Sequence, residues 1–186
     1  MAVLATLAAA ALTACGSTSA PPAGGTEAFG WLHPSAPPRG WQESRLPDGA
    51  ATLAYPTGWR AIRSDPGTVT AALRSPSGEI RGYLNATPQQ GSETLANWAS
   101  FRPEHNGEEG DVDIRTLASS AGLPFRAGHG SCVIDAYTSS NGHDYREIAC
   151  IVAGQSATTV IVGAAPPDEW QRQAPAIKHA ISSFLT

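Results

Sequence analysis

The side chains of this 186-residue chain that can transfer protons are few, and most lie far apart in the sequence. Of the five histidines, His129 and His143 flank the two ends of a predicted hairpin, so we do not expect them to meet. The sequence contains no Gly-x-Ser-x-Gly elbow, no His-Glu-x-x-His zinc motif and no phosphate-binding loop. Two histidines without a nucleophile or a metal motif favour a protein that is not an enzyme.

Carboxylates gather at two places. Glu104, His105, Glu108, Glu109, Asp111 and Asp113 crowd residues 104–113, but their spacing does not match a calcium loop. We interpret this segment as a solvated acidic loop, with calcium binding as the alternative. Asp135 and Glu147 face each other in the predicted hairpin. They form either an acid/base pair that shares a proton or, as we favour, a surface pair screened by water or by Arg146 or Arg126.

The first cysteine follows an uncharged, almost wholly apolar run, Ala2 to Ala14. These thirteen residues are too few to span a membrane, which takes about 20, but they suit the apolar region of a secretory signal. The segment Leu12-Thr13-Ala14-Cys15 resembles the lipobox of bacterial lipoproteins. The resemblance implies a diacylglyceryl group on the Cys15 thiol, cleavage before Cys15 and an acyl chain such as palmitate on the new amine. No Lys or Arg precedes Cys15, so we expect the true start to lie upstream of Met1.

Composition then divides the chain. We expect a lipoprotein signal peptide at 1–14, a flexible Ser/Pro/Gly-rich tether at 15–40 and a single α+β domain at 41–186. Phe29, Trp31 and Leu32 are candidates to dock on that domain. The formal net charge of −4 argues against a nucleic-acid partner, which needs a basic surface. The prediction is an extracytoplasmic protein held on the bacterial cell membrane by lipidated Cys15.

The strongest structural signal is a hairpin around Asn141-Gly142. A three-residue loop, Ser140 to Gly142, pairs residues whose numbers sum to 282 and puts Cys132 opposite Cys150. A two-residue loop shifts the register by one residue and separates apolar from polar side chains on the two faces of the hairpin less well. With Cys15 lipidated, an even pair of cysteines remains in an exported chain, which favours a disulfide. A redox-active or metal-binding thiol pair is the alternative, but no Cys-x-x-Cys is present.

Other elements follow from periodicity and turn residues. A mid-chain helix is predicted from Ser92, its N-cap, to Arg102, with Pro103 ending it and Leu95, Trp98, Ala99 and Arg102 on one face. A second helix is predicted to be capped by Asp168 and to end near Phe184. Pro175 lies inside its pattern and either kinks the helix or is the first residue of its main segment. We expect strands at 51–55, 69–73, 80–87, 112–115 and 158–164, the last one central and covered on both faces. Helices segregated from a mostly antiparallel twisted sheet define an α+β fold.

This order of elements resembles the PsbP/Mog1-like fold, including bacterial lipoproteins of the LpqN type. The resemblance covers residues 48–186 and is carried by Tyr55-Pro56-Thr57-Gly58-Trp59, the mid-chain helix, the long strands around Asn141-Gly142 and the ending Ala180-Ile181-Ser182-Ser183-Phe184. Members of this fold act mostly as binding or assembly modules. The resemblance therefore implies a non-catalytic role, and it assigns no cofactor and no metal.

One polar face is a candidate ligand surface, because aromatic side chains beside an amide suit ligand binding. It carries Tyr83, Asn85, Tyr137 and Tyr145. We therefore expect a non-catalytic binding module for a small molecule, a lipid or an envelope protein. The alternatives are a structural or assembly factor of the cell envelope and, less favoured, an envelope hydrolase with an unrecognised site.

Overall fold

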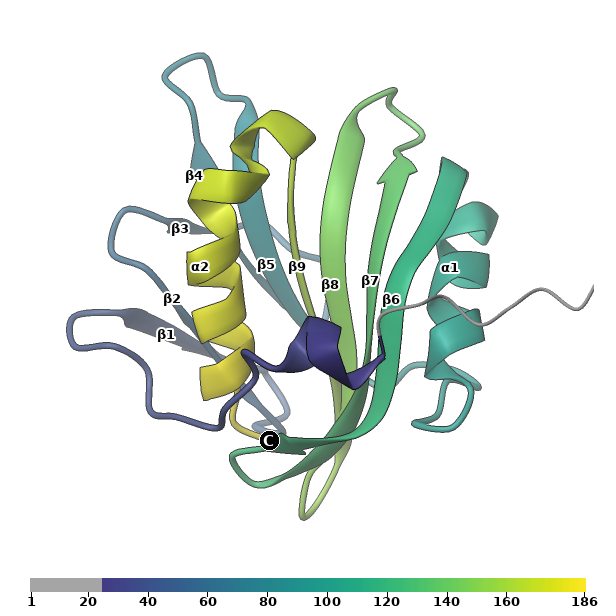
Figure 1. The fold of residues 1–186 in the computed structure, drawn as a ribbon. Helices are drawn as coiled ribbons and strands as arrows, with labels where there is room; N and C mark the ends of the chain where they lie inside the picture. Colours follow the sequence, from purple (N-terminus) through teal and green to yellow (C-terminus); the bar gives the residue numbers. More distant parts are fainter. Residues whose placement is uncertain (1–24) are drawn as a thin grey trace, which may run out of the picture.

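The computed structural model describes residues 25–186 (Figure 1). In this part of the chain a seven-stranded antiparallel sheet has the order β3-β4-β5-β9-β8-β7-β6, and β1 and β2 form a separate two-stranded sheet. The strands are β1 Gln42–Arg45, β2 Thr52–Tyr55, β3 Arg60–Ile62, β4 Val69–Arg74, β5 Ile80–Pro88, β6 Val112–Phe125, β7 Gly128–Thr138, β8 Asp144–Ala153 and β9 Thr158–Ala165. The predicted α+β class is confirmed. The predicted signal peptide, its lipobox and Cys15 lie outside the described residues.

Helices cover both faces of the large sheet. Helix α2 (Pro167–Ser183) lies across one face, over β9, β5 and β8, and helix α1 (Trp98–Glu108) lies on the other face over β6, β7 and β8 (Figure 1). Strand β9 is central and almost wholly buried, as its continuous apolar sequence predicts. No helix within residues 25–186 is long and apolar enough to span a bilayer.

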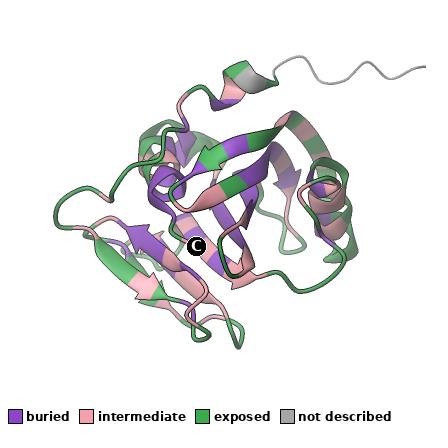
Figure 2. Ribbon diagram, turned by 90° about the horizontal axis from the view of Figure 1, so that it is seen from below, coloured by how far each residue is buried: buried purple, intermediate pink, exposed green. Residues whose placement is uncertain are grey.

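The main core lies under α2. Buried side chains of that helix, including Ile177 and Ile181, pack on Leu84, Ile148 and Ile161 of the sheet. Gly163 allows this close packing, because a Cβ atom there would lie 2.5 Å from Cγ2 of Ile177. Figure 2 shows the buried residues gathered along the strands and the exposed ones along the connecting loops. A packed core thus covers one side of the sheet, and the shorter α1 covers part of the other.

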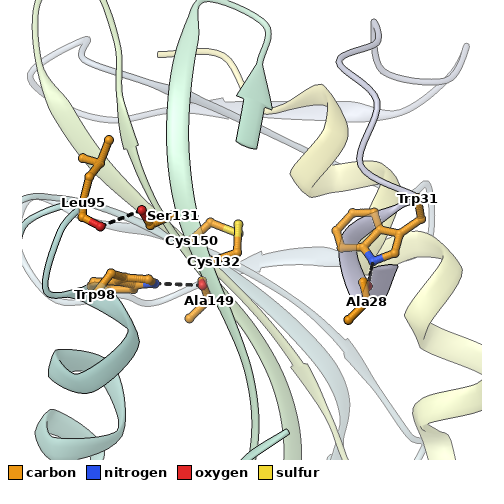
Figure 3. The surroundings of a disulfide bond; sticks show 8 residues. All are labelled: Ala28, Trp31, Leu95, Trp98, Ser131, Cys132, Ala149 and Cys150. Atoms are coloured by element: carbon orange, nitrogen blue, oxygen red, sulfur yellow. Dashed lines mark hydrogen bonds between the residues drawn. A yellow bond between two sulfur atoms is a disulfide. The ribbon is translucent and has the colours of Figure 1, made fainter. Parts of the chain in front are cut away.

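The predicted hairpin register is confirmed. Cys132 pairs with Cys150 and Asp135 pairs with Glu147, and Gly142 adopts the left-handed conformation that the loop requires, with φ +80°. A disulfide joins Cys132 and Cys150, with S–S 2.10 Å and Cα–Cα 4.1 Å (Figure 3). The bridge staples two long buried strands, β7 and β8, at the centre of the domain.

The mid-chain helix differs from its prediction. It begins at Trp98 and not at Ser92, and Pro103 lies inside it. The preceding residues form a turn in which the Glu93 carboxylate accepts hydrogen bonds from the backbone N–H groups of Gln90 and Gly91, at 2.6 and 2.7 Å. The Trp98 indole donates to the Ala149 carbonyl at 2.9 Å (Figure 3). Packing of this helix face on the sheet therefore overrides the helix-ending tendency of Pro103.

Three further predictions need correction. Residues 104–108 of the predicted acidic loop form the last turns of α1. Asp168 is not the cap of α2, because the helix starts at Pro167, whose missing N–H needs no partner there; Pro175 lies within the same helix. The packed structure also begins before Trp41, since Phe29 of helix η1 (Thr26–Phe29) and Leu32 are buried in the core.

Candidate functional site

Helix α1 covers only half of its face of the sheet. It contacts β6, β7 and β8, and a groove of about 710 Å³ runs beside it over β4, β5 and β9. Polar side chains line most of this groove, and Val160 and Val162 of β9 add an apolar strip. Its other lining residues include Arg63, Thr70, Tyr83, Asn85, Thr87, Gln90, Arg102 and His105.

The four residues predicted to form a ligand face do lie on one side of the sheet, but only two of them line the groove. Tyr83 and Asn85 lie in its wall. Tyr137 is buried, and Tyr145 contacts the Tyr83 ring edge-on, with 5.9 Å between ring centroids. The Asn85 amide donates to Thr70 Oγ1 at 2.8 Å. The structure thus gathers the three tyrosines into one aromatic cluster, of which only Tyr83 lines the groove.

A buried ion pair holds α1 against the sheet. Arg102 Nε and Nη2 donate to Glu147 Oε1 and Oε2 at 2.7 and 2.9 Å, a two-bond geometry that is among the strongest in proteins. The Glu147 side chain is fully buried and the Arg102 side chain is 13% exposed. Burial acts to lower the pKa of Arg102, but the Glu147 carboxylate outweighs it, so the net pKa is raised. Arg102 is therefore charged in the folded domain.

Two tyrosines extend this pair towards the groove. The Tyr137 hydroxyl donates to Glu147 Oε2 at 3.1 Å, and the oxygens of Tyr83 and Tyr137 lie 3.1 Å apart. Because the Tyr137 proton points at the carboxylate, Tyr83 must be the donor between the two phenols. Burial and the Glu147 charge raise the pKa of both. The chain of hydrogen bonds fixes the Tyr83 side chain where it lines the groove.

Asp135 is the unusual member of this cluster. It lies beside Glu147 in the register, both residues are 0% exposed, and neither Asp135 oxygen has a hydrogen-bond partner within the described residues. Burial, and then the Glu147 charge, raise the pKa of Asp135 to about 8. The surface interpretation of this pair was therefore wrong. Its cation is Arg102 from α1, and not Arg146 or Arg126.

The remaining candidates stay apart. His129 pairs with Ala153 at the start of β7, whereas His143 lies in the loop at the other end of the hairpin. His105 contacts Glu108 and Glu109 on the surface of α1, at 3.6 and 3.4 Å. Within residues 25–186, no three His, Cys, Asp or Glu side chains come close enough to hold a metal ion.

The sequence carried one signal for the buried ion pair. Arg102 stands four residues after Trp98 on the predicted inner face of the helix. The periodicity placed Arg102 correctly, whereas Glu147 was interpreted as a surface residue and is buried. The prediction missed their contact because the sequence did not show where α1 packs along β8.

Comparisons with known proteins agree with this architecture. No family model and no curated protein sequence matches the chain. Among solved structures, cyanobacterial PsbP (CyanoP) from Synechocystis sp. PCC 6803 is similar over 94% of this chain and 98% of its own, with a TM-score of 0.55 and 14% identity. The chain has a PsbP-like fold. At this identity, the likeness concerns the PsbP-like fold alone.

Two other solved structures are less similar. LpqN of Mycobacterium tuberculosis, which is involved in cell envelope biogenesis, has a TM-score of 0.48 and 16% identity, and the match covers 77% of this chain and 88% of LpqN. A protein from Bacteroides thetaiotaomicron VPI-5482 has a TM-score of 0.47 and 12% identity over 78% of this chain. The present chain spans about half of that protein, 48% of its length.

Proposed function

We propose that this protein is a non-catalytic binding module whose ligand, a polar small molecule, lies in the groove beside α1. The observation that carries the proposal is the half-covered sheet face. On the α2 side the sheet is closed by a packed core. On the α1 side the helix stops short of β4 and β5 and leaves a groove of about 710 Å³, which is within the size range of small-molecule sites.

The groove lining favours a polar ligand over an acyl chain. Thr87 and Gln90 offer hydroxyl and amide groups. Arg102 uses only two of its N–H groups on Glu147, and an arginine has five. Because Glu147 already balances its charge, Arg102 suits a hydrogen-bond acceptor such as a hydroxyl or carbonyl oxygen of the ligand.

The buried carboxylates support a non-catalytic role. Asp135 and Glu147 are 0% exposed, so a molecule in the groove does not touch them, and a general acid or base must reach the proton that it transfers. The tyrosine at the groove has a raised pKa, which keeps its phenol protonated and makes it a poor base. The cluster instead orders the wall of a binding site.

We also propose that Cys15 anchors the protein outside the cytoplasm, in the cell envelope. Two or three acyl chains hold a protein on a membrane far longer than one. Cys15 precedes Gly25 by ten residues, which extend over at most about 35 Å. Substituting Cys15→Ala should release the protein into the soluble fraction after export, and its retention on membranes would refute the anchor.

The groove is tested by native mass spectrometry of the exported Cys15→Ala chain. The wild-type groove is expected to carry a reproducible extra mass. A Gln90→Trp substitution fills the groove and should remove that mass. Gln155→Trp, at an exposed loop position away from the groove, is the matched control and should keep it. Retention of the mass in the Gln90→Trp protein would refute the assignment of the ligand to this groove.

A protein partner is the second candidate, and one observation favours it. Strand β6 is an edge of the sheet, and it exposes the apolar side chains of Val112 and Leu117, 56% and 39% exposed. Unpaired edge strands are common sites of association. A bare monomer mass in the native experiment, together with capture of an envelope protein that a Leu117→Lys substitution abolishes, would favour this assembly role over the groove.

A further inference from the structure

A second pocket lies on the opposite side of the molecule, between α2 and the residues that follow η1. Its volume is about 530 Å³, and Trp31 and Trp170 are among its lining residues. The Trp31 indole donates to the Ala28 carbonyl at 2.9 Å, which fixes the ring beside α2 (Figure 3). The pocket is therefore built from ordered aromatic side chains and not from a mobile loop.

A cationic side chain lies over the ring of each of these two tryptophans. The Arg146 guanidinium lies 5.1 Å from the centroid of the Trp170 ring, and the Lys178 ammonium lies 5.4 Å from that of Trp31. Both distances are within the range of cation–π contacts. These contacts position the two positive charges at the pocket without neutralising them.

Neither cation has an acidic partner in the described part of the chain. The salt bridges there include none to Arg146 or Lys178, and no Asp or Glu lines the pocket. Arg146 Nε is buried and has no hydrogen-bond partner among these residues. By contrast, Arg81 and Arg172 on the same face both contact Glu169, at 3.5 and 2.8 Å. Two uncompensated cations in a chain of net charge −4 indicate an anionic ligand.

We propose that this pocket binds the phosphate of an anionic phospholipid and so docks the domain on the membrane. Arginine and lysine both bind phosphate oxygens, and tryptophan is enriched where protein meets the headgroup layer. The pocket also lies close to the membrane along the chain, because Trp31 follows Gly25 by six residues and Cys15 by sixteen. This part of the argument rests on the proposed lipid anchor.

The inference is tested on the mature chain, residues 15–186, carrying Cys15→Ala, so that binding does not depend on the anchor. Sedimentation is compared with vesicles of phosphatidylcholine alone and with vesicles that also contain phosphatidylglycerol. We expect binding to the phosphatidylglycerol vesicles only. Each Lys or Arg near an anionic surface strengthens binding about fivefold, so Arg146→Gln with Lys178→Gln should weaken it about 25-fold.

Two controls complete the experiment. Arg172→Gln removes a cation that Glu169 already balances and should leave vesicle binding unchanged. Lys178→Glu alone changes only a half-buried surface residue and leaves Arg146 in place. Because it changes the charge by two units, it should weaken binding about 25-fold in a folded protein, as the double substitution does.

Three results would overturn the inference: equal binding to both kinds of vesicle, no binding to either, or an equal loss in the Arg172→Gln protein. Saturable binding of inorganic phosphate by a protein that does not bind the phosphatidylglycerol vesicles would show a free-anion site and overturn the membrane assignment. Vesicle binding does not depend on the lipid anchor, because the tested chain carries Cys15→Ala. Failure of the proposed anchor would be seen only in the fractionation experiment, as retention of the Cys15→Ala protein on membranes. Gln90→Trp, which fills the groove, should not change vesicle binding.

Discussion

Loss of the Arg102–Glu147 ion pair should lower the free energy of unfolding strongly. Glu147 is fully buried and Arg102 supplies both of its charged hydrogen bonds. Substituting Arg102→Met keeps much of the side-chain volume but leaves a buried carboxylate beside a second one, Asp135. Removing one partner of a buried pair costs about 3–5 kcal/mol, so we expect the free energy of unfolding to fall by about that amount at neutral pH.

The double substitution Arg102→Met/Glu147→Leu distinguishes the net contribution of the ion pair to the free energy of unfolding from the cost of leaving one buried charge without a partner. Replacing a buried pair by apolar groups of similar volume is often neutral. The double variant should therefore regain most of the stability that Arg102→Met loses, despite the lost acceptor for the Tyr137 hydroxyl. Glu147→Leu alone should cost less than Arg102→Met, because the Arg102 side chain is 13% exposed and can reach water.

Urea unfolding followed by tryptophan fluorescence, with the disulfide intact, measures all four proteins. A loss below about 1 kcal/mol for Arg102→Met, or additive losses in the double variant, would refute the interpretation that this pair fastens α1 to the sheet.

Three further changes test the core and the hairpin. The folded-state pKa of Asp135 is raised to about 8, so the folded protein keeps a proton that the unfolded chain releases near pH 4. Asp135→Asn should therefore stabilise the domain in urea unfolding, and by more at pH 8 than at pH 4. A stability difference that does not change with pH would contradict this. Replacing both Cys132 and Cys150 by Ala should cost about 3 kcal/mol, because the bridge closes a loop of about 19 residues; unchanged stability would contradict a structural role. Gly163→Ala should cost about 1–3 kcal/mol and lower the melting temperature in calorimetry, because its methyl group collides with Ile177.

Local chemistry explains why the hairpin was predictable. Asn141-Gly142 fixes the loop, and the alternation of apolar and polar residues along both strands selects a single register. That register sets Cys132 opposite Cys150 and Asp135 opposite Glu147, and it depends only on residues close together in the chain. The central place of β9 follows in the same way from its uninterrupted apolar run.

The boundaries of α1 show what reasoning from local sequence does not predict. The boundary of α1 was misplaced because Glu93 hydrogen-bonds backward into a turn and because the Trp98 indole reaches the Ala149 carbonyl on β8. The first contact is a local turn that competes with the start of a helix, and the second depends on how the helix lies against the sheet. Propensity alone makes Pro103 a helix end, and packing made it an interior residue.

The amino-acid sequence alone determined the α+β class, the hairpin register, the disulfide and the face that carries Tyr83 and Asn85, since each depends on residues close in the chain or on a period of two. Only the tertiary structure decided that Asp135 and Glu147 are buried, that Arg102 is their cation and that α1 leaves a groove. These features depend on contacts between elements far apart in the chain, such as that between Arg102 and Glu147, 45 positions apart. Such contacts are set by how whole elements pack, which local pattern and propensity do not specify.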